Sequence, residues 1–192
     1  MKRFLYNYGW VGIILAFIVM VLVMLRIVSP EEVSGERNYL DVPQEIIDAC
    51  EKWGAAYGIS PELMEADAYV ESRYQSNAVN AAGTCHGCWQ IYEYYHRDRM
   101  NKLGVTSLHD VDQCAHVMAD YFSELCEEYE DASLALMVYH GEKDAEWKYE
   151  QGIMSNYAQE VLDKAYSLEE YHGKHERAHF DPATANWAGA VG

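Results

Sequence analysis

Basic residues are scarce in this sequence. Its 192 residues include 14 Lys and Arg against 31 Asp and Glu, which gives a formal net charge of -17. Because nucleic acids and anionic lipids are bound by clusters of positive side chains, this balance excludes nucleic acid as a partner and argues against a basic lipid-binding face. A neutral glycan remains compatible, since sugars are recognised through hydrogen bonds and aromatic faces. The 16 Tyr and 5 Trp suit that role, although aromatic side chains also build cores.

The chain also lacks an alternating run of apolar and polar residues long enough for a strand, and it has no internal repeat. Apolar residues instead recur at helical spacing, as in the stripe of Ile46, Cys50, Trp53 and Tyr57. Five further helices are expected: one that begins at Ser60-Pro61-Glu62 and carries Glu71 in its last turn, and others over 91–103, 110–129, 133–139 and 157–168. The sequence therefore predicts an all-α fold.

A long uncharged run lies at the N-terminus, from Phe4 to Leu25, directly after Lys2 and Arg3. Its length matches the roughly 20 apolar residues of a transmembrane helix, and the two basic residues hold the N-terminus inside. A cleaved signal peptide is the alternative, but no small-residue cleavage site follows the run. We therefore predict a single-pass membrane anchor over residues 1–28, with the rest of the chain extracytoplasmic.

Composition divides the rest of the chain into three segments. Residues 29–43 are polar and lack a helical period, so they are expected to form a tether. Residues 44–171 carry the helical pattern and form the predicted folded domain. Residues 172–192 have no apolar face large enough for a core, and a loose tail is expected there.

Five Cys occur at positions 50, 85, 88, 114 and 126, in a region where disulfides are allowed if it lies outside the cytoplasm. Cys114 and Cys126 would lie about 18 Å apart along one helix, which is too far for a bond. We predict a disulfide from the loop 85–88 to Cys114. Free buried thiols are the alternative, and Cys50 suits it best. Neither the Cys nor the eight His have the spacing of a zinc site, so no metal and no other cofactor is expected.

Four short motifs follow one another along the predicted domain. They are Glu71-Ser72, Ala78-Val79-Asn80, Gly87-Cys88-Trp89-Gln90-Ile91 and the segment from Ala135 to Gly141. In this order they resemble the soluble lytic transglycosylase (SLT) domain, a goose-lysozyme-like family, over roughly residues 44–171. The chain departs from the usual pattern at four positions, where Ser, Leu, Met and Asn are replaced by Asn80, Cys88, Trp89 and His140.

The resemblance implies a lysozyme-like, goose-type helical domain that acts on peptidoglycan glycan strands of a bacterial cell wall. Family members cleave the MurNAc–GlcNAc bond and leave 1,6-anhydro-MurNAc ends. By this resemblance Glu71 is the catalytic acid and base, and Ser72, Gln90 and Tyr139 are substrate-binding residues. Asp67 lies one helical turn before Glu71, where a like charge would favour the protonated acid, so it is a candidate pKa modulator. Asp67 could equally pair elsewhere or point to solvent.

Two other functions stay open. A goose-type lysozyme hydrolase would need a second carboxylate to activate water, and Glu93 or Asp98 could supply it. No Asp or Glu lies between Glu71 and Glu93, which favours the transglycosylase. A catalytically silent wall-binding scaffold module is the other alternative, but it would have no need of Glu71. His140 could be a second proton-transfer group, although a lone His is more often structural.

The resemblance also bears on partners. Small membrane-anchored domains of this family often serve secretion or conjugation complexes, among other envelope processes. It therefore implies local opening of the wall beside such a complex, by a domain held on the cytoplasmic membrane through the N-terminal helix.

Overall fold

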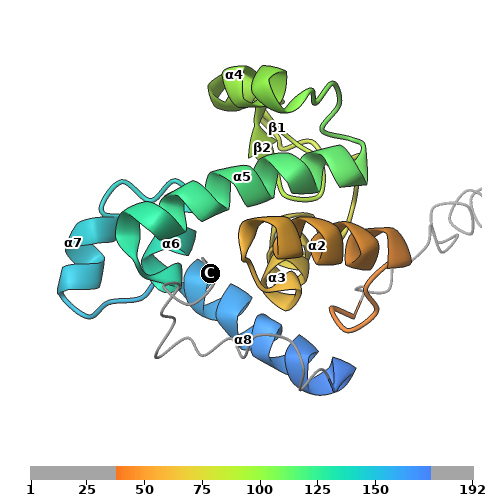
Figure 1. The fold of residues 1–192 in the computed structure, drawn as a ribbon. Helices are drawn as coiled ribbons and strands as arrows, with labels where there is room; N and C mark the ends of the chain where they lie inside the picture. The colour runs from red at the N-terminus through yellow and green to blue at the C-terminus, as the bar shows by residue number, and fades with distance from the viewer. Residues whose placement is uncertain (1–37, 174–192) are drawn as a thin grey trace, which may run out of the picture. The chain divides into compact units, whose positions relative to one another are not determined.

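The computed structural model describes residues 38–173, most of which are helical (Figure 1). The elements in chain order are α2 (Gln44–Tyr57), α3 (Pro61–Ser72), β1 (Cys85–His86), β2 (Ile91–Tyr92), α4 (Glu93–Leu103), α5 (Val111–Tyr129), α6 (Ala132–Tyr139), α7 (Ala145–Glu150) and α8 (Asn156–His172). Helix α7 lies outside the predicted set, because its six residues are too few to show a period.

A small hairpin corrects the all-α prediction. Strands β1 and β2 pair antiparallel, with Cys85 opposite Tyr92 and His86 opposite Ile91. The helix predicted over 91–103 therefore begins only at Glu93. Ile91 and Tyr92 are of residue types that favour strands, and pairing with β1 outweighs their place in a helical pattern.

Helix α3 occupies the middle of the helical layers, with α2 on one side and α8 on the other. The long helix α5 crosses beside α2 and also packs against α6 (Figure 1). Helix α4 and the hairpin lie together across α5 from α3, at the top of the view in Figure 1. The polar loop that follows α3 therefore connects the central helix to this smaller lobe.

The core is continuous and built from large apolar side chains. Trp89, Phe122 and Met64 are completely buried. The Trp89 indole Nε1 donates a hydrogen bond to the Met64 carbonyl at 2.9 Å, so its burial leaves no polar atom unsatisfied. Because this bond joins the loop after α3 to α3 itself, it holds the loop onto the core.

Local sequence sets where α3 begins and ends. The Ser60 hydroxyl accepts from the Leu63 amide, and Pro61 occupies the first helical position, as the sequence predicts. The helix ends abruptly, because Arg73 and Tyr74 both adopt left-handed backbone with φ of 57° and 64°. Two consecutive non-glycine residues in this region are strained. This reversal ends α3 at Ser72, directly after Glu71.

The folded unit begins before residue 44. Tyr39, Leu40 and Val42 pack against the core, and the Tyr74 hydroxyl donates to the Tyr39 carbonyl at 2.6 Å. The end of the predicted tether thus belongs to the domain. No helix within residues 38–173 is long and apolar enough to cross a bilayer. The predicted anchor over 1–28 and most of the predicted tail lie outside the described residues.

The disulfide prediction is wrong in this structure, in which none of the five Cys, all within the described residues, forms a disulfide. The Cys114 sulfur lies 4.0 Å from the His86 carbonyl oxygen. It therefore contacts the backbone of the loop, whereas a disulfide would require a bond to the sulfur of Cys85 or Cys88. Gly87 makes this contact close, since a Cβ there would lie 2.8 Å from the Cys114 sulfur. Burial raises the pKa of the Cys114 thiol to about 12, so it is a packing residue of low reactivity.

Candidate active site

Glu71 lies in the last turn of α3 at the inner side of a cleft of about 750 Å³. The side chain is 14% exposed, so it is largely desolvated yet open to the cleft. Aromatic rings and amides form much of the remaining lining: Asn80, Gln90, Tyr92, Tyr95, Tyr121 and Tyr139. Such a lining suits a polar ligand with apolar faces, as a sugar ring has.

Tyr157 does not line the cleft, but it hydrogen-bonds the Glu71 carboxylate. It is the second residue of α8, and its hydroxyl lies 2.8 Å from Glu71 Oε1. The same hydroxyl lies 2.5 Å from Asp67 Oδ1. Sequence reasoning missed Tyr157 because it falls on the apolar face of the last helix and belongs to none of the motifs. Its contact with Glu71 depends on the packing of α8 against α3, which no local pattern reveals.

Asp67 is completely buried one turn before Glu71. Its Oδ1 meets Tyr157, whereas its Oδ2 has no hydrogen-bond partner in the structure. Burial raises the pKa of Asp67 well above its usual range, the nearby charge of Glu71 raises it further, and the Tyr157 hydrogen bond offsets part of the rise. Asp67 therefore neither points to solvent nor pairs with a cation, and it favours the neutral form.

His140 also contacts the Oε1 oxygen of Glu71. Its Nδ1 lies 3.7 Å from Glu71 Oε1, and its ring stacks on Tyr157 with centroids 3.9 Å apart and planes 17° apart. Interaction with the Glu71 carboxylate raises the pKa of His140, burial lowers it, and the charge of Glu142 raises it. Nothing in the described residues donates a hydrogen bond to Glu71 Oε2. One carboxyl oxygen is thus held by the protein, and the other is left for a ligand.

Tyr139 lines the cleft, but its hydroxyl donates to the Trp89 carbonyl at 2.8 Å. The hydroxyl that meets Glu71 belongs to Tyr157, whereas the Tyr139 hydroxyl is bonded to the loop. Burial raises the pKa of Tyr139 well above its usual range, and the charges of Asp67 and Glu71 contribute, so the phenol stays neutral. Its position braces the loop at Trp89 and forms part of the cleft wall.

Of the two other predicted substrate-binding residues, Gln90 lines the cleft and Ser72 does not. Gln90 lines the cleft with backbone φ of 45°, and its amide nitrogen donates to the Gly87 carbonyl at 3.0 Å. This contact braces the loop and leaves the side-chain oxygen available. Ser72 does not line the cleft; its hydroxyl donates to the Ala68 carbonyl and accepts from the Gln75 amide. The structure therefore gives Ser72 the role of ending the helix.

Among the described residues that line the cleft, Asp98 is the one carboxylate besides Glu71. Glu93 lies outside the lining and faces His86 and Arg97 at 3.9 and 3.7 Å. Asp98 stays a candidate for a second acid, whereas the position of Glu93 argues against that role. Within residues 38–173, no group of His, Cys, Asp and Glu side chains could hold a metal ion.

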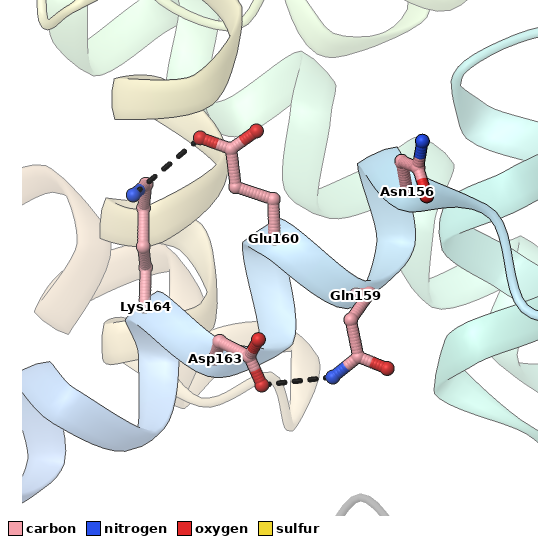
Figure 2. A pocket seen from close by; sticks show the side chains of 5 residues that line it. All are labelled: Asn156, Gln159, Glu160, Asp163 and Lys164. Atoms are coloured by element: carbon pink, nitrogen blue, oxygen red, sulfur yellow. Dashed lines mark hydrogen bonds and ion pairs between the residues drawn. The ribbon is translucent and has the colours of Figure 1, made fainter.

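A second, shallower pocket lies on the exposed side of α8 and has a different character (Figure 2). Its lining consists of polar residues about one turn apart. Lys164 Nζ lies 3.4 Å from Glu160 Oε1, and Gln159 Nε2 donates to Asp163 Oδ1 at 2.8 Å. Exposed pairs of this kind stabilise a helix by only about 0.3–0.5 kcal/mol each. This face is therefore a solvated helix surface, and it supplies control positions remote from Glu71.

The fold and the cleft define a lysozyme-like helical domain with one partly buried acid. Residues 48–162 match the family model of the transglycosylase SLT domain, which covers more than half of the chain. The chain therefore belongs to the transglycosylase SLT domain family. Comparison with curated proteins found no match.

A solved structure supports the fold. The chain is similar to the X-ray structure of an inactive mutant of the lytic transglycosylase Slt from Pseudomonas aeruginosa, with a TM-score of 0.54 and 16% sequence identity. The match covers 66% of this chain and 24% of that one, so the chain spans about a quarter of the length of this relative. At this identity the likeness shows the fold alone.

Proposed function

We propose that this protein is a peptidoglycan lytic transglycosylase in which Glu71 is the catalytic acid and base. The observation that carries the proposal is Glu71 itself, 14% exposed in the cleft of an SLT-family domain, with one carboxyl oxygen held by Tyr157. The other carboxyl oxygen is left for the substrate. The name of the Pseudomonas relative, a lytic transglycosylase, supports the same reaction class.

In the proposed reaction, the Glu71 carboxyl protonates the oxygen between MurNAc and GlcNAc as the glycosidic bond breaks. The resulting carboxylate then takes the proton of the MurNAc 6-hydroxyl, whose oxygen bonds to the anomeric carbon. The product is a 1,6-anhydro-MurNAc end, and no water is consumed. One carboxylate suffices, which agrees with a cleft where Asp98 is the one other acid among the described lining residues.

Asp98 also gives the competing reaction its best support. A hydrolase would use a second carboxylate to activate water, and Asp98 lines the same cleft. The two reactions differ in their products, since hydrolysis leaves a reducing MurNAc end. A catalytically silent wall-binding module would release neither product.

The decisive experiment is mass spectrometry of muropeptides released by the full chain and by Glu71→Gln. The substitution keeps the size of the side chain but removes the transferable proton. A group that acts as both acid and base is expected to contribute at or above the upper end of about 10²–10⁴-fold. Glu160→Gln, on the exposed side of α8 in Figure 2, is the matched control and should release anhydro products normally. Reducing ends from the unmodified protein would identify a hydrolase.

We further propose that the domain acts on the wall side of the bacterial cytoplasmic membrane, anchored by Phe4 to Leu25, to open the wall locally for a secretion or conjugation complex. The support is the uncharged run after Lys2 and Arg3, together with a glycan substrate that lies outside the membrane. External protease should digest the domain on intact protoplasts. A domain that stays protected would contradict this topology.

A further inference from the structure

A single phenol lies between two carboxyl groups in the active site. The Tyr157 oxygen is 2.5 Å from Asp67 Oδ1 and 2.8 Å from Glu71 Oε1. A phenol has one hydrogen to donate, and an ionised carboxylate can only accept. If both carboxyl groups were ionised, one of these two contacts would join two acceptors. One of the carboxyl groups must therefore carry a proton and donate it to the Tyr157 oxygen.

Asp67 is the better place for that proton. It is completely buried, and its Oδ2 has no hydrogen-bond partner. The titratable side chains that face it are Glu71 on α3, Cys50 on α2, Tyr139 on α6 and Tyr157 on α8, and none of them is a cation. A buried carboxylate without a cation is costly, so Asp67 favours the neutral acid.

Glu71 is the better place for a negative charge. Its side chain reaches the solvent of the cleft, and His140 Nδ1 lies 3.7 Å from its Oε1. The charge of Glu142 also acts on His140, so Glu71 and Glu142 share the same imidazole. The resting arrangement is thus an Asp67 carboxylic acid that donates to Tyr157, which donates to a Glu71 carboxylate.

We propose that Asp67 is a positioning residue that shares one proton with Glu71 through the Tyr157 hydroxyl. Transfer of the Asp67 proton to the Tyr157 oxygen, together with transfer of the Tyr157 proton to Glu71 Oε1, leaves Asp67 ionised, Tyr157 neutral and Glu71 protonated. No atom or charge is gained or lost. This exchange supplies the acid form of Glu71 from inside the protein, at pH values where an exposed Glu has lost its proton. The inference deepens the proposed function, but the shared proton itself does not depend on activity.

The shared proton has a measurable consequence for folding. In the unfolded chain Asp67 loses its proton near its ordinary pKa of about 3.9, whereas the folded protein retains it. The folded state then binds one more proton than the unfolded state, so stability falls as pH rises. One extra proton makes the folding equilibrium constant fall about tenfold for each pH unit above that value, until the folded group titrates. Other groups add their own dependence, so the difference between variants isolates Asp67.

The test is denaturant unfolding of the full chain, its Asp67→Asn variant and its Asp163→Asn variant between about pH 5 and pH 8. Asp163 is an exposed aspartate of α8 that is bonded to Gln159 (Figure 2) and does not line the cleft, so it is the matched control. The stability of Asp67→Asn relative to the unmodified protein should rise by close to tenfold in equilibrium constant per pH unit. Asp163→Asn should follow the unmodified protein. Parallel pH dependences for all three proteins would overturn the proposal.

Two further readouts keep the test decisive. Infrared spectroscopy of the unmodified protein at neutral pH should show the carbonyl band of a buried protonated carboxyl group, and its absence would overturn the proposal even if Asp67→Asn failed to fold. In Asp67→Asn the amide donates permanently to the Tyr157 oxygen, so the Tyr157 hydroxyl keeps donating its hydrogen bond to Glu71 and favours the ionised form of Glu71. The alkaline limb of the pH–activity profile should therefore move to lower pH, an effect that a purely structural role would not produce. If the chain proved inactive, the folding and infrared results would still decide whether the proton is shared.

Discussion

Replacement of Tyr157 by Phe removes one oxygen from the active site and little else. The ring of residue 157 can remain stacked on His140, because the 3.9 Å contact is made by the ring faces. The substitution deletes the 2.8 Å bond to Glu71 and the 2.5 Å contact with Asp67. It therefore separates the hydroxyl's contribution from that of packing.

The structure allows both effects to be estimated. Without the hydroxyl, neither oxygen of the buried Asp67 has a partner, which is expected to cost about 1–3 kcal/mol of folding stability. The bond to Glu71 is strongest after Glu71 has given up its proton, and a hydrogen bond to a charged group contributes about 1.5–3 kcal/mol. In the acid form of Glu71, from which the reaction starts, Tyr157 does not donate to Glu71. The bond is therefore made as the proton leaves, and its loss lowers kcat by about 10–100-fold, at 1.36 kcal/mol for each factor of ten.

The assay compares kcat and KM for release of anhydro products by Tyr157→Phe and by the unmodified protein. Tyr157 does not line the cleft, so KM should stay nearly constant while kcat falls. Tyr166→Phe removes the hydroxyl of an exposed tyrosine on the same helix and should change neither constant. Lost stability with an unchanged kcat would refute the reasoning and reduce Tyr157 to a structural residue. A rise in KM with constant kcat would also refute it, because the hydroxyl would then act on binding.

Two further predictions concern the surroundings of Glu71. His140→Asn should lower the free energy of unfolding below about pH 6.5, the ordinary pKa of His, because pairing with Glu71 stabilises only the protonated ring. This loss should disappear as pH rises through the raised pKa of His140. Denaturant unfolding across pH would show it, and a pH-independent difference would contradict it. Gly87→Ala places a Cβ 2.0 Å from the Leu108 carbonyl oxygen, so the melting temperature of this variant should fall well below that of Gly83→Ala. A Cβ at position 83 meets no atom within 4 Å and carries only about 1–2 kcal/mol of left-handed backbone strain. Equal melting temperatures would contradict the loop packing.

Local patterns predicted the helices well, because capping and period are properties of short segments. Ser60, Pro61 and the apolar residues that follow predict where α3 begins, and the structure confirms it. The hairpin was beyond this reasoning, since two strands of two residues each leave no alternating pattern. Their pairing depends on the turn between them, where Gly87 and Gln90 adopt positive φ.

The sequence predicted proximity in the candidate site only for residues that lie on the same helix. Glu71 and Asp67 lie on one helix, so their proximity follows from a spacing of four residues. Tyr157 comes from 86 residues further along the chain, and its contact with Glu71 exists only because α8 packs against α3. The same limit applies to Tyr139, which lines the cleft but donates its hydroxyl to the Trp89 carbonyl, a contact that no local pattern reveals.

Hydrogen bonds join the segment between α6 and α8 to the start of α8, so this segment affects the active site. Tyr157 is held at the start of α8, where the Ser155 hydroxyl accepts from the Ala158 amide. Glu142, two residues after His140, hydrogen-bonds Ser155 and accepts from Lys148 at 2.9 Å. The chain that carries His140 is thus joined to the cap of the helix that carries Tyr157. Because both side chains meet Glu71 Oε1, movement of this segment would disturb both contacts together, and the orientation of the acid is a property of three helices at once.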